Sequence, residues 1–153
     1  GGSFATVYLA PHNYHRVHLP AKATLVHTTA IPGELFSVNA YTEAAVDNLF
    51  ARNERLVCRF QTEHGTMLVV LVGALIVASI ETVWPGPRSP YRRIEQTRHD
   101  VSLARGDEIG RFLTVNLLED FLEGTEFLEY LALFLGRRSL RDAHHRVGLA
   151  RGR

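Results

Sequence analysis

A nearly continuous apolar run from Met67 to Ile80 constrains the fold more than any other part of this sequence. The run is shorter than the roughly 20 residues that a helix needs to cross a bilayer. Gly73 divides it into two parts, and both are rich in valine, isoleucine and leucine. A short apolar run of this composition favours buried strands over a membrane helix, so we predict two buried β-strands here.

Several other segments alternate between apolar and polar residues, as β-strands do. We predict strands over residues 3–10, 22–30, 55–62, 66–72, 74–83 and 107–112. One short helix is predicted from Thr42 to Phe50, with Thr42 as its N-cap. The segment from Pro85 to Pro90 predicts an exposed loop. Residues 91–104 are polar and poorly periodic, and we predict no strand there.

The C-terminal part of the chain has a different character. Leucines recur at helical spacing between residues 114 and 136, and residues 137–153 hold six arginines against one aspartate. We therefore expect a domain at 1–113, a helical extension at 114–136 and a basic, disordered tail at 137–153. The predicted fold class is β-rich (α+β): a compact multi-stranded sheet or barrel-like core with one short helix and a C-terminal helical extension.

Charge and cysteine content narrow the classes of partner and compartment. The formal net charge is only +1, which gives no reason to expect nucleic acid as a partner. Cys58 is the only cysteine, so it forms no internal disulfide, and this fits a reducing compartment. Because it lies within an alternating segment, we interpret it as a half-buried structural thiol.

The segment from Pro11 to Pro20 carries His12, His15 and His18 at three-residue spacing. Histidine gives and takes protons near neutral pH, and the prolines disfavour a helix. We therefore predict a rigid turn at a strand end that serves proton transfer. Zinc binding is the alternative, but in an extended segment His12 and His18 share a face that His15 does not. Three ligands would then not converge, so no metal site is predicted.

Five motifs, in order over about 110 residues, resemble those of phosphatidylserine decarboxylases. They are Tyr8-Leu9-Ala10-Pro11 with Tyr14-His15-Arg16-Val17-His18-Leu19-Pro20, Pro32-Gly33-Glu34-Leu35-Phe36-Ser37-Val38-Asn39, Leu49-Phe50-Ala51-Arg52-Asn53-Glu54-Arg55, Val72-Gly73-Ala74 with Ala78-Ser79-Ile80, and Gly106-Asp107-Glu108-Ile109-Gly110-Arg111-Phe112. Beyond Val115 the resemblance fades. We interpret the chain as a fragment covering most of the family's large subunit.

The resemblance implies a pyruvoyl-dependent carboxy-lyase that converts phosphatidylserine to phosphatidylethanolamine and carbon dioxide in phospholipid biosynthesis. In this family a zymogen cuts itself at the Gly-Ser bond of a Leu-Gly-Ser-Thr motif. The serine becomes a pyruvoyl group, which forms a Schiff base with the substrate amine. His18 matches the base of the family's Asp-His-Ser self-processing triad, and His15 matches the histidine that assists proton transfer during decarboxylation.

Two departures from the family pattern bear on activity. The Gly-Ser pair should follow Phe112 almost at once, but the chain continues as Leu113-Thr114-Val115. The pyruvoyl-forming serine is thus absent near Leu113-Thr114, and we expect neither self-cleavage nor a pyruvoyl group in this chain alone. The triad aspartate of the family would lie before residue 1. A true loss of Gly-Ser, a shifted reading frame and a second chain that supplies serine and aspartate are alternative explanations.

The resemblance also implies partners and a location. Phosphatidylserine and a membrane surface are the expected partners, together with a small subunit or a second copy of the chain. The expected location is peripheral to the cell membrane, on its cytoplasmic side. The alternative to an enzyme is a non-catalytic lipid-binding or subunit-interaction protein on the same scaffold.

Overall fold

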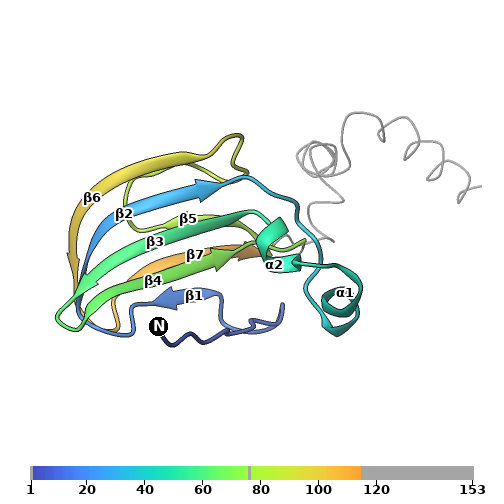
Figure 1. Ribbon diagram of the computed structural model, residues 1–153, viewed down its shortest axis with the longest axis horizontal. Coiled ribbons are helices and arrows are strands. Elements are labelled where there is room, and N and C mark those ends of the chain that lie inside the picture. The colour runs from blue at the N-terminus through green and yellow to red at the C-terminus, as the bar shows by residue number, and fades with distance from the viewer. Residues whose placement is uncertain (1, 76, 115–153) are drawn as a thin grey trace, which may run out of the picture. The chain divides into compact units, whose positions relative to one another are not determined.

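The computed structural model describes residues 2–75 and 77–114, whose strands form two antiparallel sheets (Figure 1). The three-stranded sheet has the order β1-β7-β5, formed by Arg16–His18, Glu108–Thr114 and Val77–Thr82. The four-stranded sheet has the order β4-β3-β2-β6, formed by Gly65–Val72, Arg55–Thr62, Ala23–Ile31 and Glu95–Leu103. The predicted β-rich class is confirmed, with the core strands divided between two sheets.

Strand β3 illustrates how the sequence pattern becomes structure. Its bounds are those predicted, and Leu56, Cys58 and Phe60 alternate toward the interior with 3%, 0% and 0% of their surface exposed. This period of two is the side-chain geometry of a β-strand. Burial raises the pKa of the Cys58 thiol to about 12, which suits a structural residue and not a nucleophile.

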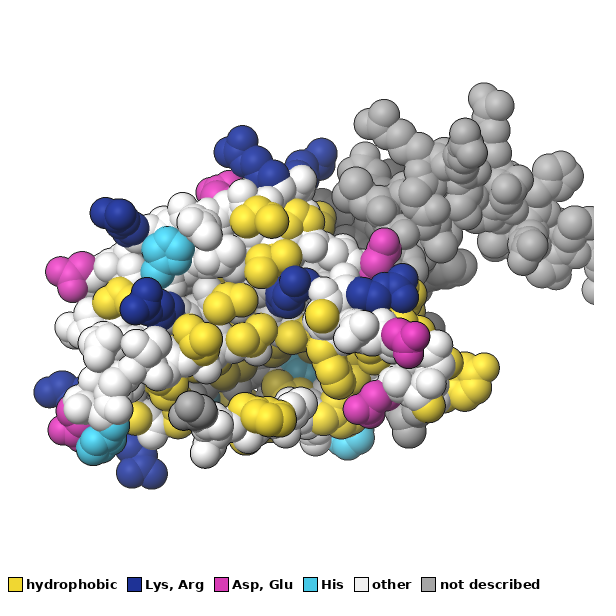
Figure 2. All heavy atoms as spheres, viewed as in Figure 1, with side chains coloured by type: hydrophobic (Ala, Val, Ile, Leu, Met, Phe, Trp, Pro, Cys, Tyr) yellow, Lys and Arg dark blue, Asp and Glu magenta, His cyan; other side chains and the backbone are white. Residues whose placement is uncertain are grey.

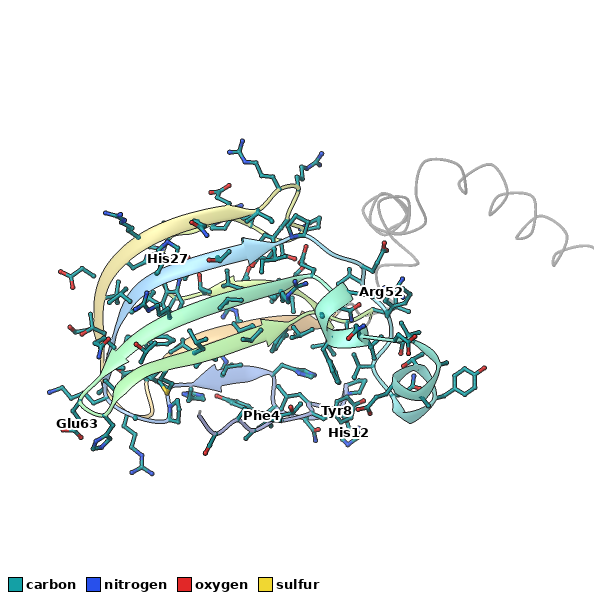
Figure 3. The ribbon with its side chains drawn as sticks, in the orientation of Figure 1. Phe4, Tyr8, His12, His27, Arg52 and Glu63 are labelled. Atoms are coloured by element: carbon teal, nitrogen blue, oxygen red, sulfur yellow. The ribbon has the colours of Figure 1, made fainter. Side chains whose placement is uncertain are left out.

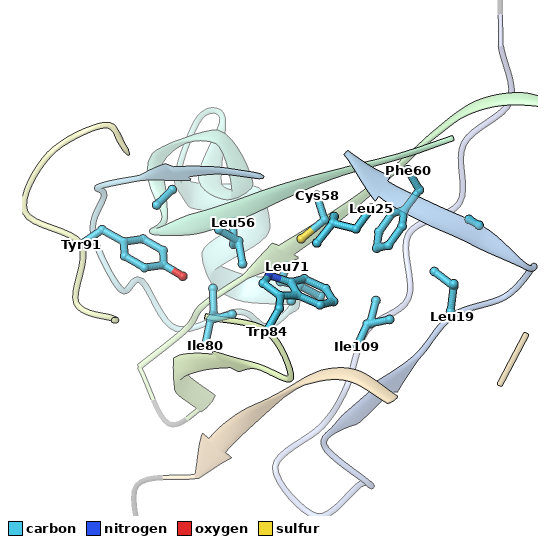
Figure 4. Close-up of a cluster of buried hydrophobic side chains, with 12 residues drawn as sticks. Leu19, Leu25, Leu56, Cys58, Phe60, Leu71, Ile80, Trp84, Tyr91 and Ile109 are labelled. Carbon is cyan, nitrogen blue, oxygen red and sulfur yellow. The ribbon is translucent and has the colours of Figure 1, made fainter. Parts of the chain in front are cut away.

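Side chains from both sheets meet in one buried cluster (Figure 4). Phe60 of β3 and Trp84, which follows β5, pack edge to face with ring centroids 6.2 Å apart. Ile109 of β7 is fully buried in the same cluster. The cluster also contains Leu19, Ala23, Leu25, Ala30, Leu56, Cys58, Leu71, Ile80 and Tyr91. The packing of these side chains holds β7, and β1 beside it, against the four-stranded sheet.

The apolar run from Met67 to Ile80 forms two strands, β4 and β5, as predicted, but β4 is not fully buried. It is an edge strand, and its side chains alternate between the core and an exposed outer face. Leu68 and Val70 on the outer face are 59% and 47% exposed. The prediction of two buried strands was wrong for β4, because composition alone does not distinguish an edge strand from a central one.

Two further strand predictions were wrong. Residues 3–10 run extended without strand pairing to the described part of the chain, although their alternation is strand-like. Conversely, residues within the polar segment 91–104 form β6, which pairs with β2 over nearly its whole length. The inward positions of β6 are only partly buried, so polar side chains are tolerated there and hide the strand pattern.

The predicted helix from Thr42 to Phe50 is two helices, α1 (Ala40–Ala45) and α2 (Leu49–Arg52). Asn39, not Thr42, is the N-cap of α1, and its side chain accepts hydrogen bonds from the Tyr41 and Thr42 amides at 3.0 and 3.1 Å. Asn48 separates the helices with a left-handed φ of 57°. Its conformation interrupts the helix that the sequence pattern suggested.

The predicted helical extension at 114–136 lies outside the described residues beyond Thr114, as does the basic tail at 137–153. Thr114 itself ends strand β7. The segment from Pro85 to Pro90 forms a loop, as predicted. Neither described helix, α1 or α2, has the length and apolar character required to cross a bilayer.

Candidate active site

The histidine segment lies beside the strand that leads to the expected cleavage position. A turn at residues 11–13 is closed by the Asn13 amide, which donates to the Ala10 carbonyl at 2.8 Å. Strand β1 follows and pairs with β7, with Val17 opposite Gly110 and His18 opposite Glu108. The predicted turn is therefore present, but His18 lies within the strand that follows it. Figure 3 shows His12 on the N-terminal segment near β1.

Close packing against β7 fixes the position of this site. Gly110 sits between the neighbouring strands, and a Cβ atom built on it would lie 2.5 Å from the backbone oxygen of Glu81 in β5. Only glycine fits such an approach without displacement of the backbone. Val17 packs against the buried cluster, whereas Arg16 and His18 are exposed on the other face of β1. His18 is thus presented to solvent.

Two hydrogen bonds define the state of the His18 ring. Its Nδ1 lies 2.8 Å from the carbonyl oxygen of Gly106, and its Nε2 lies 2.8 Å from the hydroxyl of Tyr14. A carbonyl oxygen only accepts, so Nδ1 carries the hydrogen and donates it. In the neutral ring Nε2 then bears the lone pair and accepts from Tyr14. The nitrogen suited to act as a base is the one that faces the tyrosine.

His15 has the opposite arrangement. Its Nε2 lies 3.0 Å from the carbonyl oxygen of Pro11, so Nε2 carries the hydrogen. Its Nδ1 is buried and has no hydrogen-bond partner among the described residues. In the neutral ring this nitrogen has an unused lone pair, and a buried acceptor without a partner is costly. His15 therefore offers Nδ1 as a proton-accepting atom.

No hydrogen bond joins His15 to His18, and no carboxylate of the described residues hydrogen-bonds either ring. The carboxylates close to His18 have other partners: Glu108 pairs with Arg16 at 2.6 Å, and Asp107, next to Gly106, accepts from the Ala104 amide at 2.7 Å. The Asp–His part of a triad is thus not assembled from residues 2–75 and 77–114. The Gly106 carbonyl occupies the position at Nδ1 where a triad would place its carboxylate.

The expected position of the Gly-Ser pair falls on the last residues of β7. Leu113 and Thr114 pair with Ala78 and Val77 of β5. The Phe112 amide donates to the His15 carbonyl at 3.0 Å, while His18 lies opposite Glu108. At roughly 3.3 Å per residue, Thr114 is about 20 Å further along β7 than Glu108. His15 is therefore the nearer of the two histidines to this position.

Two other residues of the family-like motifs are buried and shape the interior. The Asn53 side chain accepts from the Phe36 amide at 2.8 Å and donates to the Gly73 carbonyl at 3.0 Å. The Glu54 carboxylate accepts from the Tyr91 amide at 2.6 Å and from the Ser89 hydroxyl. Burial raises the pKa of Glu54 above its ordinary value, against the effect of these hydrogen bonds.

Sequence reasoning singled out both histidines, whose roles stay predictions, but it did not predict their hydrogen-bond partners. Tyr14 stands in the same motif, four residues before His18, and this spacing was the only available signal. The contribution of Gly106 is a main-chain carbonyl 88 residues away, which no side-chain pattern reveals. Among the described residues, no three histidine, cysteine, aspartate or glutamate side chains gather as a metal site.

Comparison with known proteins gives a consistent result. The family model for phosphatidylserine decarboxylase matches residues 1–120. A phosphatidylserine decarboxylase proenzyme of Acinetobacter baylyi is 61% identical over 111 residues, which is 72% of this chain and 39% of the relative. The proenzyme of Psychrobacter arcticus is 60% identical over 72% of the chain and 40% of the relative.

A more distant relative covers a similar region. The phosphatidylserine decarboxylase proenzyme of Ectopseudomonas mendocina is 56% identical over 119 residues, covering 73% of this chain and 42% of the relative. The chain thus spans about two fifths of the length of these curated relatives. The family model matches most of the residues of this chain, including the histidine motif that leads into β1, and the chain therefore belongs to the phosphatidylserine decarboxylase family.

Proposed function

We propose that this chain supplies the histidine-bearing part of a phosphatidylserine decarboxylase, which releases carbon dioxide from phosphatidylserine and leaves phosphatidylethanolamine. The observation that carries this proposal is the pairing of β1 with β7. It sets two histidines, with lone pairs on different nitrogens, beside the strand that ends at Leu113-Thr114. An imidazole with a lone pair placed in this way is suited to proton transfer near neutral pH.

The two histidines take different roles in this proposal. His15 serves proton transfer during decarboxylation, because its buried Nδ1 has no other partner among the described residues and its backbone contacts Phe112. His18 matches the self-processing base of the family, and the Gly106 carbonyl holds its ring as the Nδ1–H tautomer that such a base requires. Because His18 lies opposite Glu108 and not beside Leu113-Thr114, the serine would have to reach its Nε2 on a separate segment. The role of His15 is thus supported by its unpartnered Nδ1, and the role of His18 by its Nε2, which accepts from the exposed Tyr14.

The pyruvoyl group does not fit the described residues. Where the resemblance places the serine that would become the group, Leu113 and Thr114 complete strand β7 and pair with β5. The described carboxylates also leave His18 without the acidic partner of a triad. We therefore propose that the chain alone does not cut itself and forms no pyruvoyl group. Decarboxylation then requires a serine-bearing segment from another chain.

A membrane surface is the proposed environment of this site. Hydrophobic side chains gather across the face of the molecule shown in Figure 2. Leu68 and Val70 are exposed on the outer face of β4, and the exposed Arg59 lies opposite Leu68 on β3. Phe4 and Val7 of the N-terminal segment are 94% and 79% exposed. Apolar side chains beside a cation suit contact with an anionic lipid surface, here proposed as the cytoplasmic side of the cell membrane.

Intact-mass analysis of the purified chain tests the processing proposal. We expect a single uncut species that borohydride does not change. Two fragments, of which one carries a carbonyl that borohydride reduces, would overturn the proposal. A second measurement follows ethanolamine lipid in phosphatidylserine vesicles after addition of a family member's serine-bearing segment. A His15→Gln variant should abolish the product that the unchanged chain gives in the same mixture.

A second candidate function is lipid binding without catalysis, which the absence of a Gly-Ser pair directly after Phe112 favours. Sedimentation with phosphatidylserine vesicles and with neutral vesicles distinguishes the two. Binding that depends on phosphatidylserine, with no ethanolamine lipid formed even when the serine-bearing segment is supplied, supports the second function. A small subunit or a second copy of the chain is the protein partner proposed for the catalytic case.

A further inference from the structure

We propose that Tyr14 is a positioning residue for His18: its hydroxyl donates to Nε2 and caps the lone pair that the base uses, while the Gly106 carbonyl fixes the other nitrogen. This inference deepens the proposed function and rests on it for the role of His18 as a base. The hydrogen-bond arrangement itself stands on the geometry alone.

The Gly106 carbonyl determines which nitrogen of His18 carries the hydrogen. The Gly106 carbonyl accepts at 2.8 Å and has no hydrogen to give, so His18 Nδ1 must donate. Gly106 reaches this position with a φ of +90° in the turn before β7, a backbone conformation that residues other than glycine rarely adopt. The carbonyl is thus delivered by a backbone geometry that favours glycine.

In the neutral ring, the Tyr14 hydroxyl is the partner of the other nitrogen of His18. Once Nδ1 carries the hydrogen, Nε2 can only accept, and the Tyr14 hydroxyl at 2.8 Å is its donor. The two rings are nearly parallel, with an interplanar angle of 10° and centroids 5.7 Å apart. Tyr14 therefore holds the plane of the imidazole as well as its tautomer. Both ends of the ring are fixed, as in a histidine prepared for proton transfer.

Because Tyr14 is exposed, its hydrogen bond to Nε2 of His18 is accessible to molecules from solvent. Its side chain is 63% exposed and lies before β1, outside the sheet ladder. A substrate hydroxyl that approaches from solvent can replace the tyrosine hydroxyl at Nε2 without disturbing the buried cluster. His15 has no such cap. Its Nε2 carries the hydrogen and faces the Pro11 carbonyl, and its Nδ1 has no partner among the described residues. The two histidines of one motif are thus held as opposite tautomers.

Nitrogen NMR of the imidazoles tests the arrangement in the chain itself. Long-range ¹H–¹⁵N spectra are recorded at a pH of about 8.5, two units above the ordinary histidine pKa. Spectra of His15→Gln and His18→Gln assign the two rings. We expect His18 as the Nδ1–H tautomer and His15 as the Nε2–H tautomer. In Tyr14→Phe the Nε2 resonance of His18 should move toward that of an acceptor without a hydrogen bond.

Chemical modification gives a second readout. Diethyl pyrocarbonate acylates an imidazole nitrogen with an available lone pair, and loss of one hydrogen bond should speed modification of His18 by about threefold to tenfold. The exposed His12 serves as the internal reference in each sample. Tyr41→Phe is the matched control, because Tyr41 is 81% exposed on α1 and its hydroxyl has no partner among the described residues.

The outcomes separate this inference from the proposed function. An Nε2–H tautomer at His18, or a His18 resonance and reactivity that Tyr14→Phe leaves unchanged, would overturn the role of Tyr14 whatever the chain does with lipid. Opposite tautomers together with faster modification in Tyr14→Phe would support it even if no decarboxylation were found. Because Tyr14 is exposed, we expect Tyr14→Phe to fold like the original chain. Unchanged resonances of the other imidazoles in the same spectra would confirm this.

Discussion

Glu54 is a carboxylate in the interior with no cationic partner among the described residues. Only 2% of its surface is exposed, and its two hydrogen-bond donors are the Tyr91 amide and the Ser89 hydroxyl. These contacts attach the loop from Pro85 to Pro90 to the start of β3. The residue therefore connects a segment without regular structure to the four-stranded sheet.

The raised pKa of Glu54 predicts how stability depends on pH. Because burial favours the protonated form, the folded chain binds this proton more tightly than the unfolded chain does. The contribution of Glu54 to the free energy of unfolding should be complete below the ordinary value of 4.5 and fall as pH rises through the raised pKa. In Glu54→Gln this contribution disappears, so the variant should gain stability relative to the original chain across that interval.

Urea denaturation at a series of pH values measures this difference. Glu63→Gln is the control for the substitution itself, because the Glu63 side chain is 84% exposed. Glu54→Ala should lose about 1–3 kcal/mol at all these pH values, since the buried Tyr91 amide would lose its acceptor. If the difference in unfolding free energy between Glu54→Gln and the original chain stays constant with pH, the pKa of Glu54 is not raised by burial.

At the scale of single residues, the motif drew attention to His15 and His18, whose chemistry stays a prediction, but it did not reveal their surroundings. The side-chain types and their spacing were visible in the sequence. The direction of each ring was not, because backbone carbonyls of Pro11 and Gly106 determine it. A sequence pattern describes side chains, and main-chain acceptors leave no trace in it.

Among the elements, β3 and β4 offer a direct comparison of a buried and an exposed position. Phe60→Ala removes a fully buried ring at the centre of the cluster and should cost about 3–5 kcal/mol of unfolding free energy. Leu68→Ala on the outer face of the neighbouring strand should change it by less than about 0.5 kcal/mol. Equal losses for both variants in urea titrations would show that β4 does not have the described orientation.

The elements also show where sequence prediction failed. Strand β3 was predicted with its bounds because its inward side chains are apolar and fully buried. Strand β6 was missed because its inward positions include the polar residues Thr97 and His99. These positions are only partly buried, so they do not require apolar side chains. Residues 3–10 have the pattern of a strand but no strand neighbour in the described chain, and a strand exists only through its partner.

At the scale of the whole described unit, the two sheets share one interior. Leu25 of β2 and Ile109 of β7 are both fully buried in the same cluster. We therefore predict that their amides exchange with solvent only through the same global opening, with equal free energies. Native-state hydrogen exchange measures this, and a β7 amide that opens well before the β2 amide would show that the three-stranded sheet is a separate unit.

The division into two sheets also explains what the fold class could not specify. Alternation predicts that a segment is a strand and which residues face inward. It does not say which strands are neighbours, and here β1, near the N-terminus, pairs with β7, about 90 residues later in the chain. The proximity of the histidine segment to Leu113-Thr114 is a consequence of that pairing and not of local sequence.

The contact between Trp84 and His99 makes the interior optically readable. The chain has a single tryptophan, and its indole lies edge to face with the imidazole of His99, with centroids 6.1 Å apart. Burial, followed by the nearby His27, lowers the pKa of His99 below its ordinary value of 6.5. A charged imidazolium quenches indole emission, so acidification through the lowered pKa of His99 should reduce the fluorescence while the fold persists. The protein therefore carries an intrinsic reporter for the protonation of one histidine.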